Sequence, residues 1–543
     1  MNNTRWRIEI MHSFNLVDEP WIPVRPIGAS TTQLMGLRDV LLGAHAIREL
    51  VDPSPLVTVS LHRLLLAILH RVFGPRDDAE WAELYGGGSF PPQPLEDYLQ
   101  RWHDRFDLFH EKYPFYQKGS IQRQSVTKLW PVTRLAPEIA SPGNATTLFD
   151  HTLPEGVAFT PDRAARYLVL LHPFTVGGLF GLLKGEKDKA ADAGPLAKCA
   201  VVLLRGRTLF ETLMLNMVRY DPEFDEPCPS TPEDSPAWER DDDTQPVDRL
   251  PKGYLDYLTW QSRRVRLFPE VQDGRVVVRE VIIVKGCQLR PTEEIANYET
   301  MVAFRKNPRA GKGENPRPPV GFREDRAMWR DSHVIFQSTD THTQPRSLRW
   351  IAELIAMGRL QEEHRLPLEI YGIITDQANI KLWRHEVLPV STRYFSDRNL
   401  YSQLQRALAM AESVGQELDR TLEQLARDLL PNPNRDEINN LRKAINATPT
   451  YWASLEVPFH HFLLELEADR QLVQGRPIYG YGYAMRNWMD AIKQAGRLAL
   501  EFAVSGLDGN ARNLRAAVNA RGRFNGRLNT LLAQEAPGLE LPA

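Results

Sequence analysis

The chain has 543 residues, with 66 Lys or Arg against 69 Asp or Glu, so its formal net charge at pH 7 is −3. Hydrophobic residues make up 42% and charged residues 25%, which excludes a collagen-like, low-complexity or mostly disordered chain. Three widely separated cysteines exclude a disulfide framework and paired cysteine ligands for structural zinc. No signal peptide or membrane-spanning segment of about 20 apolar residues is recognisable. We therefore expect a cytoplasmic protein of several domains, with no membrane partner, no cofactor and no metal.

The N-terminal part combines short strand-like and helical patterns. Residues 14–24 predict a strand that ends at a proline-rich turn, because Pro20 and Pro23 cannot both sit inside a paired ladder. Leucines and isoleucines at helical spacing predict a helix over residues 61–73. We expect His62, Arg63 and His70 at the solvated edges of that helix.

An acidic segment interrupts the middle of the chain. Residues 221–248 hold eleven acidic residues, six prolines and one basic residue, Arg240. This composition buries too little apolar surface to order itself, so it predicts a surface loop or linker. Its charge would repel nucleic acid, so it should lie away from any bound phosphate backbone.

Two antiparallel hairpins follow. Strand-forming residues flank Asp273-Gly274, a pair that supplies the positive φ angles of a two-residue turn. A second pair of strands, at residues 368–374 and 380–383, flanks residues 375–379 and places Gln377 near an exposed tip.

Long amphipathic helices dominate after residue 397. Leucines recur every three or four residues from Leu400 to Leu429, and further helical segments are expected at roughly residues 449–472, 481–504 and 509–534. Long helices with short connections pack antiparallel. The sequence thus predicts mixed α and β content with antiparallel hairpins over residues 1–396 and a C-terminal four-helix bundle over residues 397–543.

Enzyme motifs are weak. Gly177, Gly178, Gly181, Lys184 and Gly185 approach the composition of a phosphate-binding loop but not its spacing. The sequence contains no HExxH or Gly-x-Ser-x-Gly motif and no cysteine with a recognisable base partner.

Two basic clusters are better candidates for function, because Lys and Arg contact phosphates whatever the base sequence. Residues 305–323 hold six basic residues against one acid, Glu314, among glycines and prolines, which predicts a mobile positive loop. The last helix has no acid between residues 510 and 534. The alternative is that both clusters serve solubility. The candidates for contact with a nucleic-acid backbone are Arg305, Lys306, Arg309 and Lys312 in the loop and Arg512, Arg515, Arg523 and Arg527 in the helix.

Several blocks resemble one family in the same order along the chain. They are Phe14-Asn15-Leu16-Val17-Asp18-Glu19-Pro20-Trp21-Ile22-Pro23-Val24, Tyr113-Pro114-Phe115-Tyr116-Gln117, Phe174-Thr175-Val176-Gly177-Gly178, Leu258-Thr259-Trp260-Gln261, Asp376-Gln377-Ala378-Asn379-Ile380 and Arg384-His385-Glu386-Val387-Leu388. With the C-terminal bundle, they resemble the large subunit (CasA family) of the type I-E CRISPR surveillance complex, Cascade.

This resemblance implies an α+β fold with a large irregular N-terminal domain, and a non-catalytic role. Family members bind double-stranded target DNA, read the motif adjacent to the target from the minor groove, and help the guide RNA invade, while base pairing supplies sequence specificity. The implied partners are guide RNA, target DNA, other Cascade subunits including the small helical ones, and a helicase-nuclease.

The resemblance also implies a motif-reading site. Gly177 and Gly178 match a glycine loop laid against the minor groove, although an ordinary turn is the alternative. Lys285 matches a lysine finger, or is a solvated lysine at a strand end. Gln377 matches a wedge that inserts at the first base pairs, supported by Asn379.

A further stretch, residues 135–149, matches the loop that contacts the guide RNA's 5′ handle. Asn144 and Phe149 are its candidate contacts, since an aromatic side chain can stack on a splayed RNA base. Phe149 could equally be buried in the core.

Two other classes of function stay open. A metal-dependent nuclease or hydrolase would use carboxylates brought together only by the fold. A purely structural scaffold subunit would assemble the complex without any dependence on the adjacent motif.

Overall fold

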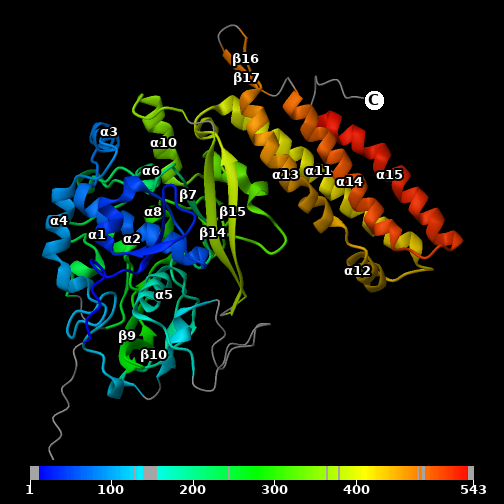
Figure 1. Ribbon diagram of the computed structural model, residues 1–543. Helices are drawn as coiled ribbons and strands as arrows, with labels where there is room; N and C mark the ends of the chain where they lie inside the picture. The colour runs from blue at the N-terminus through cyan, green and yellow to red at the C-terminus, as the bar shows by residue number, and fades with distance from the viewer. Residues whose placement is uncertain are drawn as a thin grey trace, which may run out of the picture. The chain divides into compact units, whose positions relative to one another are not determined.

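The computed structural model describes residues 12–126, 129–137, 156–241, 245–312, 314–362, 365–376, 379–473, 476–479 and 483–535. The chain divides into two compact units, each with its own core. The first contains residues 1–323, 338–361 and 368–387, and the second residues 324–337, 362–367 and 388–543. The fold is α+β, with small, mainly antiparallel sheets and long C-terminal helices (Figure 1).

Small sheets and short helices build the first unit. Its helices are α1 Leu37–Leu42, α2 Pro55–Phe73, α3 Asp78–Gly86, α4 Pro92–Arg101, α5 Pro161–Phe174, α6 Leu209–Asn216, α7 Tyr254–Leu258, α8 Ile295–Tyr298 and α10 Arg346–Ala356. Its larger sheets have the strand orders β2-β1-β3, β4-β10-β9 and β15-β14-β7. Their strands are β1 Ile22–Pro26, β2 Gln33–Met35, β3 Ile47–Leu50, β4 Trp130–Pro131, β7 Val201–Leu204, β9 Arg263–Gln272, β10 Arg275–Lys285, β14 Leu366–Asp376 and β15 Asn379–Val390. Two-stranded pairs add β5 Gly178–Leu179 with β6 Ala190–Ala191, β8 Asp248–Arg249 with β11 Gln288–Leu289, and β12 Phe304–Arg305 with β13 His342–Thr343.

The first predicted hairpin is confirmed. β9 and β10 pair antiparallel, and Asp273 and Gly274 have φ angles of 50° and 75° at its turn. The strands of the second predicted hairpin are present as β14 and β15, and residues 377 and 378 lie outside the described residues. The N-terminal strand begins later than expected, at Ile22, because the Asn15 side chain accepts a hydrogen bond from Val17 N and stabilises a turn there.

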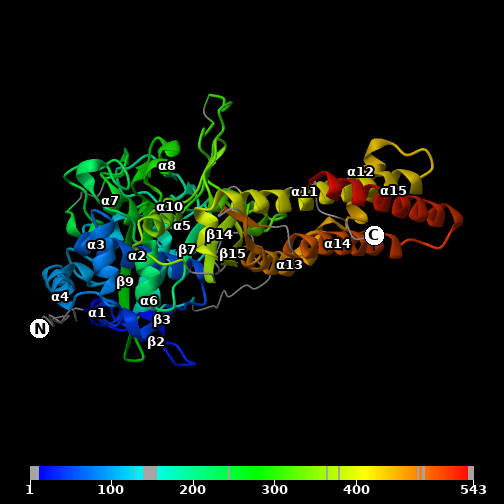
Figure 2. The same ribbon diagram turned by 90° about the horizontal axis from the view of Figure 1, so that it is seen from above.

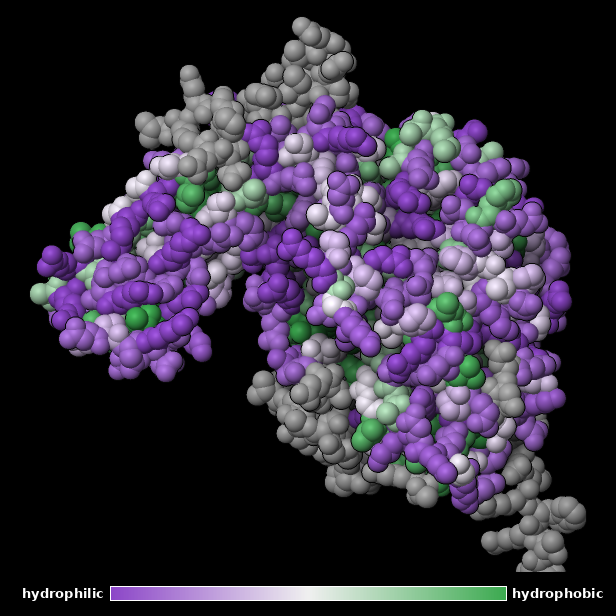
Figure 3. Space-filling view, turned by 180° about the vertical axis from the view of Figure 1, so that it is seen from behind, coloured by the Kyte–Doolittle hydropathy of each residue, from purple (hydrophilic) through white to green (hydrophobic). Residues whose placement is uncertain are grey.

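The central helix α2 is buried on all sides, so the expectation of solvated edges is wrong. His62, Arg63 and His70 are 4%, 4% and 1% exposed. In each histidine, Nδ1 forms a hydrogen bond with the backbone carbonyl four residues earlier. Arg63 forms an ion pair with Glu299. Of the described helices, α2 alone is long and apolar enough to cross a membrane, contrary to our expectation. Most of it, 83%, is buried inside the fold, as in a core helix, while hydrophilic side chains cover most of the face seen in Figure 3.

The acidic segment is more ordered than its composition predicts. Trp238 and Cys228 are buried, and Asp234 accepts hydrogen bonds from Leu255 N and Asp256 N at the start of α7. One carboxylate therefore supplies the partners that the first backbone N–H groups of a helix lack. Residues 242–244 lie outside the described residues.

A helical bundle forms most of the second unit, as predicted. Figures 1 and 2 show its four long helices side by side: α11 Arg398–Leu429, α13 Thr448–Ala468, α14 Tyr483–Ser505 and α15 Ala511–Glu535. A short helix, α12 Arg435–Ala444, and a hairpin of β16 Arg470–Val473 with β17 Arg476–Tyr479 occupy connections between them.

The core of the second unit includes a segment from the middle of the sequence. Trp329 precedes α9 Ser332–Phe336 and packs on Phe459 and Trp488, with ring centroids 4.7 and 6.2 Å away. Arg330 lies over the Trp452 ring at 3.4 Å and pairs with Glu412 at 2.9 Å. This stretch thus completes the aromatic core of the bundle.

Two glycines allow a direct test of the bundle's packing. A Cβ added at Gly415 on α11 would lie 2.7 Å from the Trp452 ring, whereas one at Gly522 on α15 would meet nothing within 4 Å. Gly415→Ala is expected to lower the free energy of unfolding by about 1–3 kcal/mol despite its better helix propensity, because overpacking shifts the tryptophan. Gly522→Ala should raise it by about 0.5–1 kcal/mol. Urea unfolding of both variants measures the difference, and equal effects would contradict close packing at Gly415.

Candidate functional site

The segment that follows the glycine pair contacts the end of β10 at Lys285. Lys285 is the last residue of β10, and Gly181 forms a parallel bridge with the preceding Val284. Asp188, from the loop that follows the glycines, lies 2.6 Å from Lys285 Nζ. The structure therefore brings together two of the three predicted motif-reading elements, which are more than 100 residues apart in sequence.

Gly177 and Gly178 occupy positions where a side chain would be crowded or would strain the backbone. A Cβ at Gly177 would lie 3.1 Å from Ala193 N and 3.3 Å from Ala191 O, so the close approach at this position is to the chain's own backbone. Gly178 has a φ of 152°, which side chains disfavour. Next to it, Leu179 is 62% exposed. The glycines therefore form a turn, and the exposed side chain of Leu179 lies at its surface.

Arg263 organises this loop and was missed in the sequence. It is fully buried on β9, and its Nη2 donates to Val176 O at 2.9 Å and Asp192 O at 2.7 Å. Its guanidinium also lies over the Phe180 ring at 4.2 Å. Burial lowers the pKa of Arg263 to about 9. One cation thus joins the two ends of the 176–192 segment, and no local pattern signals a pairing over this distance.

Lys285 is held rather than free. Only 13% of its side chain is exposed, and the ion pair with Asp188 occupies its ammonium group. The pKa of the Asp188 carboxyl is lowered, chiefly by the hydrogen bond from Lys285 and next by the one from Ala190 N. Any other anion at this lysine must therefore compete with Asp188.

The second hairpin is anchored at its base. Glu369 on β14 pairs with Arg205 at 3.0 Å, and the Tyr371 ring stacks on His385 of β15 with centroids 4.4 Å apart. β14 also pairs with β7. The predicted wedge Gln377 lies outside the described residues, and Asn379 begins β15. The handle candidates Asn144 and Phe149 also lie outside the described residues.

The basic loop after β12 has both paired and exposed cations. Lys306 Nζ donates to Thr339 O at 3.0 Å, and Arg305 lies on β12, which pairs with β13. Arg309 and Lys312 are exposed, and their side chains make no hydrogen bond or ion pair among the described residues.

The arginines of α15 divide into two groups. Arg523 pairs with Asp428 at 2.8 Å and Arg527 with Glu417 at 3.7 Å, so both join α15 to α11. Arg512 and Arg515 are exposed at the start of the helix and form no ion pair within the described part of the chain. They are the ones available to a partner without breaking a bond in the bundle.

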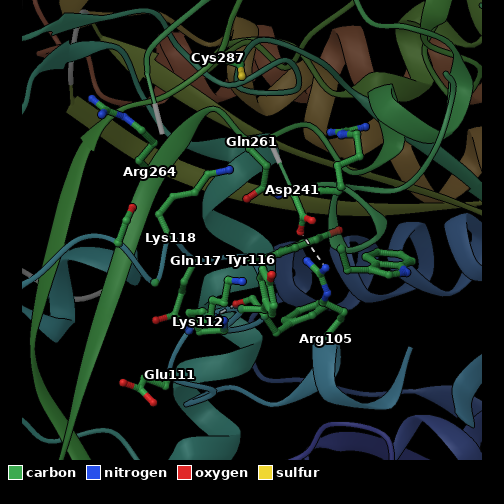
Figure 4. A pocket seen from close by; sticks show the side chains of 18 of the residues that line it. Arg105, Glu111, Lys112, Tyr116, Gln117, Lys118, Asp241, Gln261, Arg264 and Cys287 are labelled. Atoms are coloured by element: carbon green, nitrogen blue, oxygen red, sulfur yellow. Dashed lines mark hydrogen bonds and ion pairs between the residues drawn. The ribbon is translucent and has the colours of Figure 1, made fainter. Parts of the chain in front are cut away.

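A cleft of about 790 Å³ lies in the first unit, beside the Tyr113-Pro114-Phe115-Tyr116-Gln117 block (Figure 4). Arg105 and Asp241 form an ion pair of 2.7 Å in its lining. Arg264, also in its lining, pairs with Glu186 at 2.7 Å. Two of the arginines in its lining, Arg105 and Arg264, are thus engaged in ion pairs. No group of three or more His, Cys, Asp or Glu suited to a metal ion occurs among the described residues.

Comparisons with known proteins agree with this architecture. The family model for the CRISPR-associated protein Cse1 matches residues 15–499. This chain belongs to the Cse1 family. It is 32% identical to the CRISPR-associated protein CasA/Cse1 of Thermus thermophilus, over 97% of this chain and 99% of that one.

Solved structures share the Cse1 fold. Cse1 from Acidimicrobium ferrooxidans superposes with a TM-score of 0.80 at 24% identity, covering 97% of this chain and 99% of that one. A chain of a CRISPR RNA-guided surveillance complex gives 0.73 at 20% identity, covering 94% and 99%. At these identities the likeness is one of fold, and it extends over both compact units.

Proposed function

We propose that this Cse1-family chain is the large, non-catalytic subunit of a CRISPR RNA-guided surveillance complex. In it the chain reads a short motif in double-stranded DNA from the minor groove, opens the first base pairs and recruits a helicase-nuclease. The observation that carries the proposal is that the segment after the glycine turn joins the end of β10, through Gly181 at Val284 and Asp188 at Lys285.

The chemistry of this edge suits a minor groove. Gly178 carries no side chain that could keep a narrow groove away, and a single lysine can donate to the acceptors on base edges there. The minor-groove pattern is degenerate, so we expect tolerance of several motifs. The remaining partners are the guide RNA handle, the small helical subunits and the displaced strand, with Arg512 and Arg515 as contacts for that strand.

Lys285→Ala in the guide-loaded complex tests the reading role. We expect affinity for a duplex with the preferred motif to fall about tenfold, as for removal of one hydrogen bond to a base, while affinity for a motif-free duplex stays nearly unchanged. Electrophoretic mobility shifts over a panel of motifs measure the ratio.

Asp188→Asn is the matched control. It removes the same ion pair but leaves the lysine, so motif preference should be kept. Equal losses in both variants would show that the pair has only a structural role. A native complex without any motif preference would favour the scaffold alternative, and cleavage of DNA by the chain alone with a divalent metal would favour the enzyme.

A further inference from the structure

The loop between β5 and β6 alternates basic and acidic residues. Its sequence is Lys184-Gly185-Glu186-Lys187-Asp188-Lys189. All three lysines are exposed, and their side chains make no hydrogen bond or ion pair with any described residue. The formal charge of the loop is therefore only +1, but its charges are not equally available.

Both acids are bound by basic residues of the β9–β10 hairpin. Glu186 pairs with Arg264 on β9 at 2.7 Å, and Asp188 pairs with Lys285 on β10 at 2.6 Å. Each carboxylate also accepts a backbone hydrogen bond from its own loop, from Leu183 N at 3.1 Å and Ala190 N at 2.9 Å. With the acids neutralised by the hairpin, the three lysines present their charge to solvent.

The loop is fixed at several points along its length. Lys184 N donates to Ser125 O at 2.9 Å, and Phe180 N donates to Lys189 O at 2.9 Å. Leu183 bridges to Val126 and packs on the buried cluster of Ile121, Ile282 and Val284. Its lysines are therefore presented by an ordered backbone, so binding an anion costs the side chains' entropy but little backbone entropy.

We propose that this lysine loop, residues 184–189, binds the phosphate backbone of the target DNA duplex next to the motif-reading edge. The inference rests on the proposed function, because the loop shares the Asp188–Lys285 pair with that edge. A duplex seated on the glycine turn would bring its phosphates to the adjacent lysines, which supply affinity independent of base sequence. The loop would hold the duplex in register beside the glycine turn.

The test is a triple variant, Lys184→Gln, Lys187→Gln and Lys189→Gln, in the guide-loaded complex. The side chains of these lysines have no partners among the described residues, so folding should be unaffected. We expect affinity to fall about ten- to a hundredfold at about 150 mM salt, equally for duplexes with and without the motif. The slope of log K against log salt should fall by about 2–3, since each phosphate that a lysine neutralises adds about 0.9 to it.

A charge-matched control replaces three exposed arginines of the first unit, Arg48→Gln, Arg76→Gln and Arg101→Gln. Its affinity should change less than twofold. An unchanged salt slope in the lysine variant, or equal losses in both triples, would overturn the proposal. Retained duplex binding with weakened guide RNA loading would assign the loop to RNA instead and overturn it as well. If Lys285→Ala leaves motif preference intact while the lysine variant loses affinity, the role of Lys285 in motif reading is contradicted. The proposal that residues 184–189 bind phosphates is then still supported.

Discussion

Replacing Arg63 with methionine is expected to lower the free energy of unfolding of the first unit by about 3–5 kcal/mol, the cost of breaking a buried ion pair. Arg63 on α2 and Glu299 form two contacts of 3.0 and 3.1 Å, and both are 4% exposed. Burial disfavours the cation, yet the Glu299 carboxylate raises the pKa of Arg63 above its ordinary value. Without the arginine, the carboxylate keeps hydrogen bonds from Tyr257 Oη and Met301 N but is a buried charge without a counterion.

Urea unfolding followed by tryptophan fluorescence measures this loss. Adding Glu299→Gln to the variant removes the unpaired buried charge. The amide oxygen can still accept from Met301 N, and the amide nitrogen can donate to Tyr257 Oη, so about half of the stability should return. Arg207→Met is the exposed counterpart: its pair with Glu211 at 3.0 Å leaves the arginine side chain 76% exposed, and the loss should be below about 1 kcal/mol. A loss of that size at Arg63 would contradict a buried, energetically important pair.

Local patterns predicted the elements that depend on neighbouring residues. The β9–β10 turn follows from the positive φ angles that Asp273 and Gly274 adopt, and the four long helices follow from the 3.6-residue period. The same period misjudged α2, because a helix covered on every side shows no polar face to place its histidines on. The acidic segment was misjudged for a related reason, since Trp238 and Asp234 are ordered by other parts of the fold.

What sequence reasoning missed are pairings between distant residues. Arg63 and Glu299 are 236 positions apart, and Lys285 and Asp188 are 97 apart. Neither residue of a pair signals its partner by spacing. No sequence pattern indicates that Trp329 packs into the bundle. The predicted domain boundary at residue 397 therefore left out residues 324–337, which belong to the core of the second unit. The resemblance to a family supplied candidate residues for the site, and the structure supplied Arg263 and Asp188, which hold them.

Replacing Gln377 with alanine is expected to slow R-loop formation by at least about tenfold, while docking of the closed duplex changes little. In sequence this residue falls between β14 and β15, and β14 is anchored through the pair of Glu369 with Arg205. We infer that the amide, which both donates and accepts, replaces hydrogen bonds of the first opened base pair and offsets part of an unstacking cost of a few kcal/mol. Opening of a supercoiled target plasmid by the guide-loaded complex, followed by permanganate reactivity of unpaired thymines, gives the rate.

A target with a premade bubble at the first base pairs separates opening from every other step. On that substrate the Gln377→Ala complex should match the native rate, because the cost that the amide offsets has already been met by the mismatch. If R-loop formation is still slow on the bubble substrate, Gln377 acts in guide pairing or complex assembly rather than in opening the duplex. An unchanged rate on the intact duplex, with motif preference retained, would remove Gln377 from the mechanism and leave the glycine turn and Lys285 to carry both reading and opening.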